Sequence, residues 1–312
     1  MTRQSSRPPP RLPLPPRVRF WLGLLLALVL GYLIALVQGA VVRPPLVIGQ
    51  DAVPPSGPVQ GVTSTLENQG GAFLDIKPGG AATTLLVYYP GGLVRPQAYE
   101  WLGRALAADG VQTVIPVFPL DLAVTGINRA DALIRKFGAG KTVVIAGHSL
   151  GGAMAAQYAR GHRDQLSGMI LMGAYPAGNV NLKESRLPVL SLLAEQDGVA
   201  EPADVRDGLN RLPASAQLTV IPGAVHSFFG RYGAQRGDGL PTVTRAAAEA
   251  GILRAVRAFL ATLPPPSGDA GHCARTSTAS AVRSAMTSGH ERVGAHERVA
   301  GAGGTSAACV MA

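Results

Sequence analysis

Apolar and polar positions alternate regularly between residues 83 and 263. Short apolar runs typical of buried strands are separated by longer stretches in which apolar residues recur at helical spacing, as Trp101 and Ala105 do. The predicted strands are 83–89, 111–118, 142–146, 168–173, 189–194 and 217–221, the predicted helices are 96–108, 127–137 and 242–263, and a hairpin of strands 61–66 and 72–77 precedes them. This alternation predicts an α/β fold with a mostly parallel sheet covered by helices on both faces.

A different pattern occupies residues 20–42, which are uncharged and almost entirely apolar. At about 1.5 Å per residue, a helix of this length spans a hydrocarbon core of about 30 Å. A cleaved secretory signal is the alternative, but the run is long for one and its Gln38-Gly39-Ala40 exit is a poor cleavage site. Five arginines precede the run, against Arg43 just after it, which predicts a retained signal anchor with a cytoplasmic N-terminus and an extracytoplasmic remainder.

These patterns divide the chain into five parts. Residues 1–19 form a basic, proline-rich cytoplasmic segment, 20–42 the transmembrane anchor, and 43–60 a proline-rich linker. Residues 61–263 form the folded domain. Residues 264–312 are rich in alanine, glycine, serine and threonine, which predicts a disordered low-complexity tail.

Charge and cysteine content narrow the possible partners. The formal net charge is +9, but five arginines lie before the apolar run, where they serve topology, so a nucleic-acid partner is not predicted. Both cysteines, Cys273 and Cys309, lie in the tail, so neither a disulfide framework nor a cysteine zinc cluster is expected in the folded domain. The sequence contains no nucleotide, flavin or metal motif, and no cofactor is predicted.

Residues 142–152, T-V-V-I-A-G-H-S-L-G-G, carry the main chemical signal. A β-branched run meets a tight turn with Ser149 at its apex and then enters a helix-compatible series. Gly147 and Gly151 flank the serine by two positions, as the crowding of a strand-turn-helix nucleophile requires. A glycine-rich turn with an incidental serine is the alternative, but this context favours a nucleophile.

Such a serine needs a base and an orienting acid. Of the six histidines, three lie in the tail, His148 adjoins the serine and is expected to point away from it, and His162 lies at the far end of the next helix. His226, which follows the predicted strand 217–221, is therefore the predicted base. Asp197, in a turn after strand 189–194, is the preferred acid. The reserves are Glu195, Glu201 and Asp204.

The Y-P-G-G-L-V loop at residues 89–94 follows a strand well before the serine. Its position predicts backbone donors for a developing oxyanion, from Gly91 or Gly92 together with Leu150. An ordinary glycine turn is the alternative.

Four ordered motifs together resemble the α/β-hydrolase superfamily, and in particular a compact bacterial family within it. They are Y-P-G-G at 89–92, G-H-S-L-G-G-A-M-A at 147–155, D-G-V at 197–199 and H-S-F-F-G-R-Y-G-A-Q-R-G-D-G at 226–239. The resemblance implies an α/β-hydrolase fold with the triad Ser149, Asp197 and His226, in agreement with the residue-level choice.

The predicted function is that of a membrane-anchored serine esterase acting on small or medium esters. Residues 174–188 leave no room for a cap domain, so a shallow site is expected, with Phe228, Phe229 and Tyr232 as candidate lining residues or core residues. A catalytically inactive hydrolase-fold binding module at the membrane is the main alternative.

Overall fold

The computed structural model describes residues 15–41 and 61–265. The first range is a single helix, α1 (Pro16–Val41), which begins ahead of the predicted apolar run. It is long and apolar enough to be a membrane span or a signal sequence. The segments predicted as the basic N-terminal region, the linker and the tail lie largely outside the described residues.

The second range folds around a sheet whose strands follow the order β1-β2-β4-β3-β5-β6-β7-β8. The strands are β1 (Thr63–Asn68), β2 (Ala72–Lys77), β3 (Thr84–Tyr89), β4 (Val111–Pro116), β5 (Thr142–His148), β6 (Gly168–Met172), β7 (Val189–Ala194) and β8 (Gln217–Ile221). The β1–β2 hairpin pairs antiparallel with β4, and all later pairs are parallel. The predicted mostly parallel α/β sheet is therefore confirmed.

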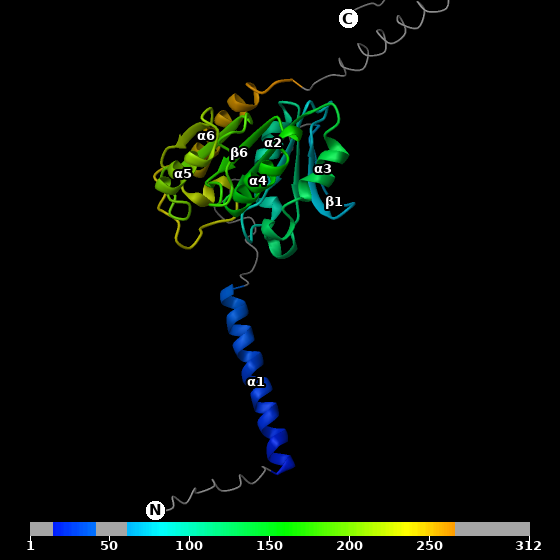
Figure 1. Ribbon diagram of the computed structural model, residues 1–312, viewed down its shortest axis with the longest axis vertical. Helices are drawn as coiled ribbons and strands as arrows, with labels where there is room; N and C mark the ends of the chain where they lie inside the picture. Colours follow the sequence, from blue (N-terminus) through cyan, green and yellow to red (C-terminus); the bar gives the residue numbers. More distant parts are fainter. Residues whose placement is uncertain (1–14, 42–60, 266–312) are drawn as a thin grey trace, which may run out of the picture. The chain divides into compact units, whose positions relative to one another are not determined.

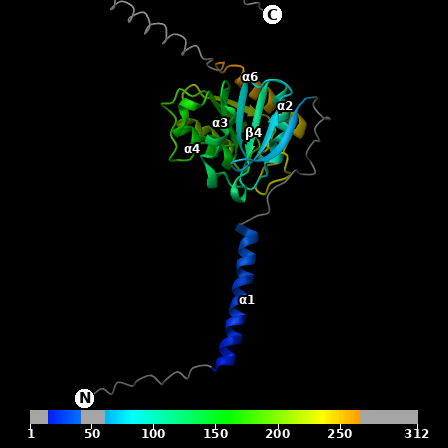
Figure 2. The same cartoon turned by 90° about the vertical axis from the view of Figure 1, so that its right-hand side faces the viewer.

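Helices cover both faces of this sheet. They are α2 (Glu100–Ala107), α3 (Arg129–Phe137), α4 (Leu150–Gly161), α5 (Pro202–Gly208) and α6 (Arg245–Leu260). The helix predicted at 96–108 begins instead as a 3-10 turn, η1 (Pro96–Tyr99). Figure 1 shows the helices around the sheet, and in Figure 2 α3 and α4 lie on one side of it while α2 and α6 lie on the other.

Two large hydrophobic cores result, one on each face. Side chains of α2 and α6, such as Leu106 and Ile252, pack on one face, while side chains of α3 and α4, such as Leu133 and Ala156, pack on the other. Strand β5 is buried along its whole length, as expected for the β-branched centre of a parallel sheet. The rigid sheet thus fixes the loops at the carboxyl ends of its strands, where α/β proteins bind their ligands.

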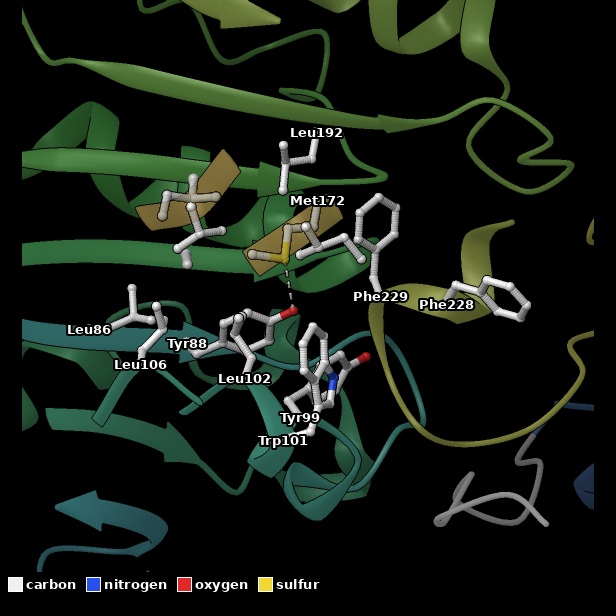
Figure 3. Close-up of a cluster of buried hydrophobic side chains, with 14 of the residues drawn as sticks. Leu86, Tyr88, Tyr99, Trp101, Leu102, Leu106, Met172, Leu192, Phe228 and Phe229 are labelled. Atoms are coloured by element: carbon white, nitrogen blue, oxygen red, sulfur yellow. Dashed lines mark hydrogen bonds between the residues drawn. The ribbon is translucent and has the colours of Figure 1, made fainter. Parts of the chain in front are cut away.

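The first core is rich in aromatic side chains. Phe228, Phe229 and Tyr232, the candidate lining or core residues, belong to this core. All three are buried in this cluster, with exposed fractions of 7%, 1% and 4%. Figure 3 shows Phe229 close to Met172, with the Tyr88 hydroxyl bonded to the Met172 sulfur at 3.5 Å. These aromatic residues anchor the segment after β8 to the sheet.

Candidate active site

The turn after β5 holds its serine in a strained conformation. Ser149 has φ 52° and ψ −126°, a region that non-glycine residues adopt at a cost of about 1–3 kcal/mol. A side chain at Gly147 would approach the Gly151 carbonyl carbon to 2.5 Å, and one at Gly151 would collide with the backbone of Tyr89 and Pro90. Glycine is required at both positions because strand, turn and helix meet there. The half-buried serine consequently sits at the apex, directly before α4.

The turns after β7 and β8 bring together an acid and a histidine. Nδ1 of His226 lies 2.8 Å from Oδ2 of Asp197, and both side chains are fully buried. The other carboxylate oxygen, Oδ1, accepts the N–H groups of Val199 and Ala200 at 2.9 and 2.7 Å. Asp197 is therefore held in one orientation, with one oxygen aimed at the imidazole.

The reserve acids are placed differently. Glu195 accepts the N–H of Gly223 at 2.8 Å. Glu201 and Asp204 belong to the start of α5, at its N-cap and in its first turn. Of the four acids considered, Asp197 is the one that the structure bonds to His226 within the described chain.

The imidazole ring of His226 lies beside the nucleophile turn. The rings of His226 and His148, the residue before the serine, are 4.4 Å apart between centroids. Nε2 of His226 is buried and has no hydrogen-bond partner among the described residues, so the Ser149 hydroxyl does not yet bond to it in this structure. An imidazole with Nδ1 on a carboxylate and Nε2 unpaired has the arrangement of a general base.

The loop after β3 lies over the start of α4. A side chain at Gly92 would contact the Leu150 side chain at 3.2 Å. Leu150 is the first residue of α4, so its N–H has no acceptor within the helix. The N–H of Gly91, by contrast, donates to the Tyr99 hydroxyl at 3.0 Å. Of the three expected oxyanion donors, Gly91 is therefore engaged, whereas no hydrogen bond to another described residue is made by the N–H groups of Gly92 and Leu150.

Tyr99 and His148 connect the loop after β3 with the turn after β5, and no sequence pattern indicated this role. The Tyr99 hydroxyl lies 2.8 Å from Nδ1 of His148. The hydroxyl oxygen also accepts the Gly91 N–H, and the tautomer of His148 sets whether the hydroxyl donates to Nδ1 or accepts from it. Burial, together with the charge of His226, holds the pKa of His148 well below its usual value of 6.5. Burial also raises the pKa of Tyr99, so both side chains stay neutral near pH 7.

A cavity of about 320 Å³ opens beside the serine. It is lined by Ser149, Leu150, Ala153, Gly173, Ala174, Tyr175, Ala177, Val199 and Ala200, none of which carries a charge. A larger cavity of about 740 Å³, lined by residues that include Arg160 and Glu184, contains none of the candidate catalytic residues. Within residues 15–41 and 61–265, no cluster of three or more histidine, cysteine or acidic residues is arranged to hold a metal ion. The smaller cavity is therefore the candidate substrate site.

Comparisons with known proteins agree with this architecture. The chain is similar to a dienelactone hydrolase from Anabaena variabilis ATCC 29413, with 17% identity and a TM-score of 0.50 over 66% of this chain and 100% of that one. It is also similar to carboxyl esterase 2 from the mycorrhizal fungus Tuber melanosporum, with 14% identity and a TM-score of 0.51 over 70% of this chain and 92% of that one. At such identities the likeness concerns the fold. No curated protein matches the chain.

The family model gives the more direct result. Residues 85–250, more than half of the chain, match the model of the alpha/beta hydrolase family. The matched range contains the strained serine turn, the Asp197–His226 pair and the loop over α4. The chain therefore belongs to the alpha/beta hydrolase family.

Proposed function

We propose that this protein is a membrane-anchored serine hydrolase of the carboxylesterase type, in which Ser149 is the nucleophile, His226 the base and Asp197 the orienting acid. The observation that carries the proposal is the 2.8 Å contact between Asp197 and His226. The imidazole of His226 in turn packs against His148, the residue before the strained Ser149. The four sequence motifs further favour the compact bacterial branch of the family.

The geometry supports an acyl-enzyme mechanism. The Ser149 oxygen attacks the ester carbonyl carbon while Nε2 of His226 takes the hydroxyl proton, and Asp197 stabilises the resulting imidazolium. The N–H groups of Leu150 and Gly92 would bind the negative charge that develops on the carbonyl oxygen. The tetrahedral intermediate then expels the alcohol, which receives the proton from His226. Water releases the acid by the same steps, with His226 again acting as base.

The cavity beside the serine supports an uncharged ester as substrate. Its lining of alanine, valine, leucine and tyrosine side chains favours an apolar group, and about 320 Å³ falls at the small end of ligand pockets. A charged group placed there would lose hydration without gaining an oppositely charged side chain among the lining residues. The two structural neighbours are named as a dienelactone hydrolase and a carboxyl esterase, and an ester is the substrate class that we propose here.

We further infer that α1 is the retained signal anchor, with the N-terminus cytoplasmic and the hydrolase domain outside the cytoplasm. The helix is uncharged from Phe20 onward, and five arginines lie before that position, with Arg17 and Arg19 in the first turn of α1. In this scheme residues 43–60 link the anchor to the catalytic domain, 61–263. Intact-mass measurement of the membrane-extracted protein tests retention, because a cleaved signal would remove the N-terminal mass.

Replacing the serine tests the catalytic proposal. In the full-length protein in detergent micelles, Ser149→Ala should lower kcat for a short-chain nitrophenyl ester by at least about 10⁴-fold, because the acyl acceptor is gone. The matched control is Ser167→Ala. Ser167 is also half-buried, but it lies just before the amino end of β6, whereas Ser149 follows the carboxyl end of β5. The control variant should retain wild-type kcat.

Circular dichroism should show that both variants are folded. Wild-type activity in Ser149→Ala would refute the proposal. A wild-type protein that hydrolyses none of a series of nitrophenyl esters would favour the inactive binding module instead.

A further inference from the structure

The candidate acid and base come from two separate turns, so their contact depends on how these turns are held together. Asp197 follows β7, and His226 opens η6 (His226–Phe229) after β8. The 2.8 Å bond between them joins the two side chains, but a bond that must survive changes in the charge of His226 needs independent support from the backbone. The surroundings of the two turns contain such support.

The carboxylate of Asp238 bonds to both turns at once. Its Oδ2 accepts the N–H of Ser227 at 2.8 Å, and its Oδ1 accepts the N–H of His226 at 2.9 Å. Oδ1 also accepts the N–H of Gly239 at 2.9 Å and, on the other turn, that of Gly198 at 3.4 Å. One side chain therefore connects the residue after the acid with the first two N–H groups of the histidine turn.

Backbone contacts explain why glycines surround this aspartate. A side chain at Gly198 would come within 2.9 Å of the Gly239 nitrogen and would collide with the Gly237 carbonyl oxygen. A side chain at Gly239 would likewise collide with the Gln196 carbonyl oxygen, and Gly237 has a φ of 85°. The G-D-G segment thus lies directly on the acid turn, and only residues without Cβ allow this approach.

A second charged side chain holds the opposite end of η6. Arg245, 5% exposed, donates through Nη1 to the carbonyl oxygens of Ser227 and Gly230, and its guanidinium lies 4.5 Å from the centre of the Phe228 ring. The turn that carries His226 is therefore bonded by a carboxylate at its N–H groups and by a guanidinium at its carbonyl groups. Each charge matches the polarity of the backbone groups that it contacts.

We propose that Asp238 is a positioning residue for catalysis, which holds the acid turn and the histidine turn in the register that lets Asp197 orient His226. Asp238 contacts His226 through its main-chain N–H, whereas Asp197 contacts the ring, so Asp238 acts through the other two residues. This role rests on the proposed serine hydrolase activity. It also gives a function to the G-D-G end of the fourth sequence motif.

A double-mutant cycle on the full-length protein in micelles tests this role. Asp197→Asn should lower kcat for a nitrophenyl ester by about 10³–10⁴-fold, as loss of the orienting acid does in other serine hydrolases. Asp238→Asn keeps the shape of the side chain but turns one acceptor into a donor, and should lower kcat about 10–100-fold with KM within about threefold of wild type. The control is Asp207→Asn, an exposed carboxylate on α5, which should have no effect.

The double variant carries the decisive result. If both residues act by orienting His226, Asp197→Asn/Asp238→Asn should be no more than about threefold slower than Asp197→Asn alone. Effects that multiply, or an Asp238→Asn kcat within about threefold of wild type, would overturn the proposed role. Asp238→Glu, which keeps the charge but displaces it, replaces Asp238→Asn in the cycle if the latter fails to fold, with the same criteria. An inactive wild type or an active Ser149→Ala would instead refute the hydrolase proposal itself.

Discussion

The turns after β7 and β8 are joined through a carboxylate, that of Asp238, whereas the turns after β3 and β5 are joined through the uncharged side chains of Tyr99 and His148. Both devices bond to backbone N–H groups and bridge segments far apart in sequence. They differ in charge, and the difference follows the charge that the proposed reaction would create at each end.

At the acid–base end, His226 would become positively charged when it takes the serine proton. A nearby carboxylate stabilises that cation, so the negative charge of Asp238 does not oppose the proposed reaction there. At the other end, negative charge would develop on the carbonyl oxygen beside Leu150 and Gly92. A carboxylate in the place of Tyr99 would repel it, whereas a neutral hydroxyl and imidazole fix the loop without opposing the oxyanion.

Removing the Tyr99 hydroxyl, which links the loop after β3 to His148, should therefore weaken stabilisation of the oxyanion without altering substrate binding. Tyr99→Phe leaves the Gly91 N–H and Nδ1 of His148 without their shared partner, and should lower kcat about tenfold or more, short of the 10²–10³-fold lost with a whole oxyanion donor. KM should change little, because these donors act on the transition state.

Tyr88→Phe is the matched control for Tyr99→Phe. Tyr88 is an equally buried tyrosine whose ring lies 4.9 Å from that of Tyr99, and its hydroxyl donates a hydrogen bond to the Met172 sulfur (Figure 3). It should keep wild-type kcat. If steady-state kinetics gave the two variants the same kcat, the loop would not depend on the Tyr99 hydroxyl.

A smaller effect should appear in the pH dependence of stability. The pKa of His148 is held well below 6.5 in the folded protein, by burial and by the charge of His226, while Tyr99, Phe229 and Tyr232 also surround its ring. Because the unfolded chain binds a proton at His148 below about pH 6.5 and the folded chain does not, its contribution to stability is complete above that pH and is lost as the pH falls.

His148→Gln isolates this contribution, because glutamine offers Tyr99 an acceptor that does not titrate. Between about pH 6.5 and pH 5, the free energy of unfolding of the wild type should fall more steeply than that of the variant, by up to about 1.4 kcal/mol per pH unit. Urea unfolding at several pH values measures the two slopes. Parallel slopes would show that His148 takes up its proton in the folded state.

The contrast between the two ends also shows which features sequence patterns can predict. Strand and helix periodicity predicted the sheet, because burial imposes these periods on local sequence. Ser149 and its glycines were found because a strained turn leaves a local signature. His226 and Asp197 were selected by their place after strands, and the structure brings them to 2.8 Å.

Tyr99 and His148 had no such signature, and Asp238 was part of the fourth motif without a role of its own. Tyr99 lies on an apolar helical face, where it reads as a core residue, and His148 was set aside because it adjoins the serine. Their partner Gly91 lies on another element, and Asp238 bonds to residues 12 and 40 positions earlier. These contacts depend on how distant segments meet in three dimensions, which periodicity does not encode.

Covalent labelling of the nucleophile tests the central claim most directly. A fluorophosphonate probe added to the full-length protein in micelles should lose fluoride and form a phosphorus–oxygen bond to the serine that His226 activates. Peptide mapping by mass spectrometry should then find the adduct on the peptide containing Ser149, and heat-denatured protein should not be labelled. Absence of an adduct on the folded protein, or an adduct on another serine, would contradict the assignment of Ser149 as the nucleophile.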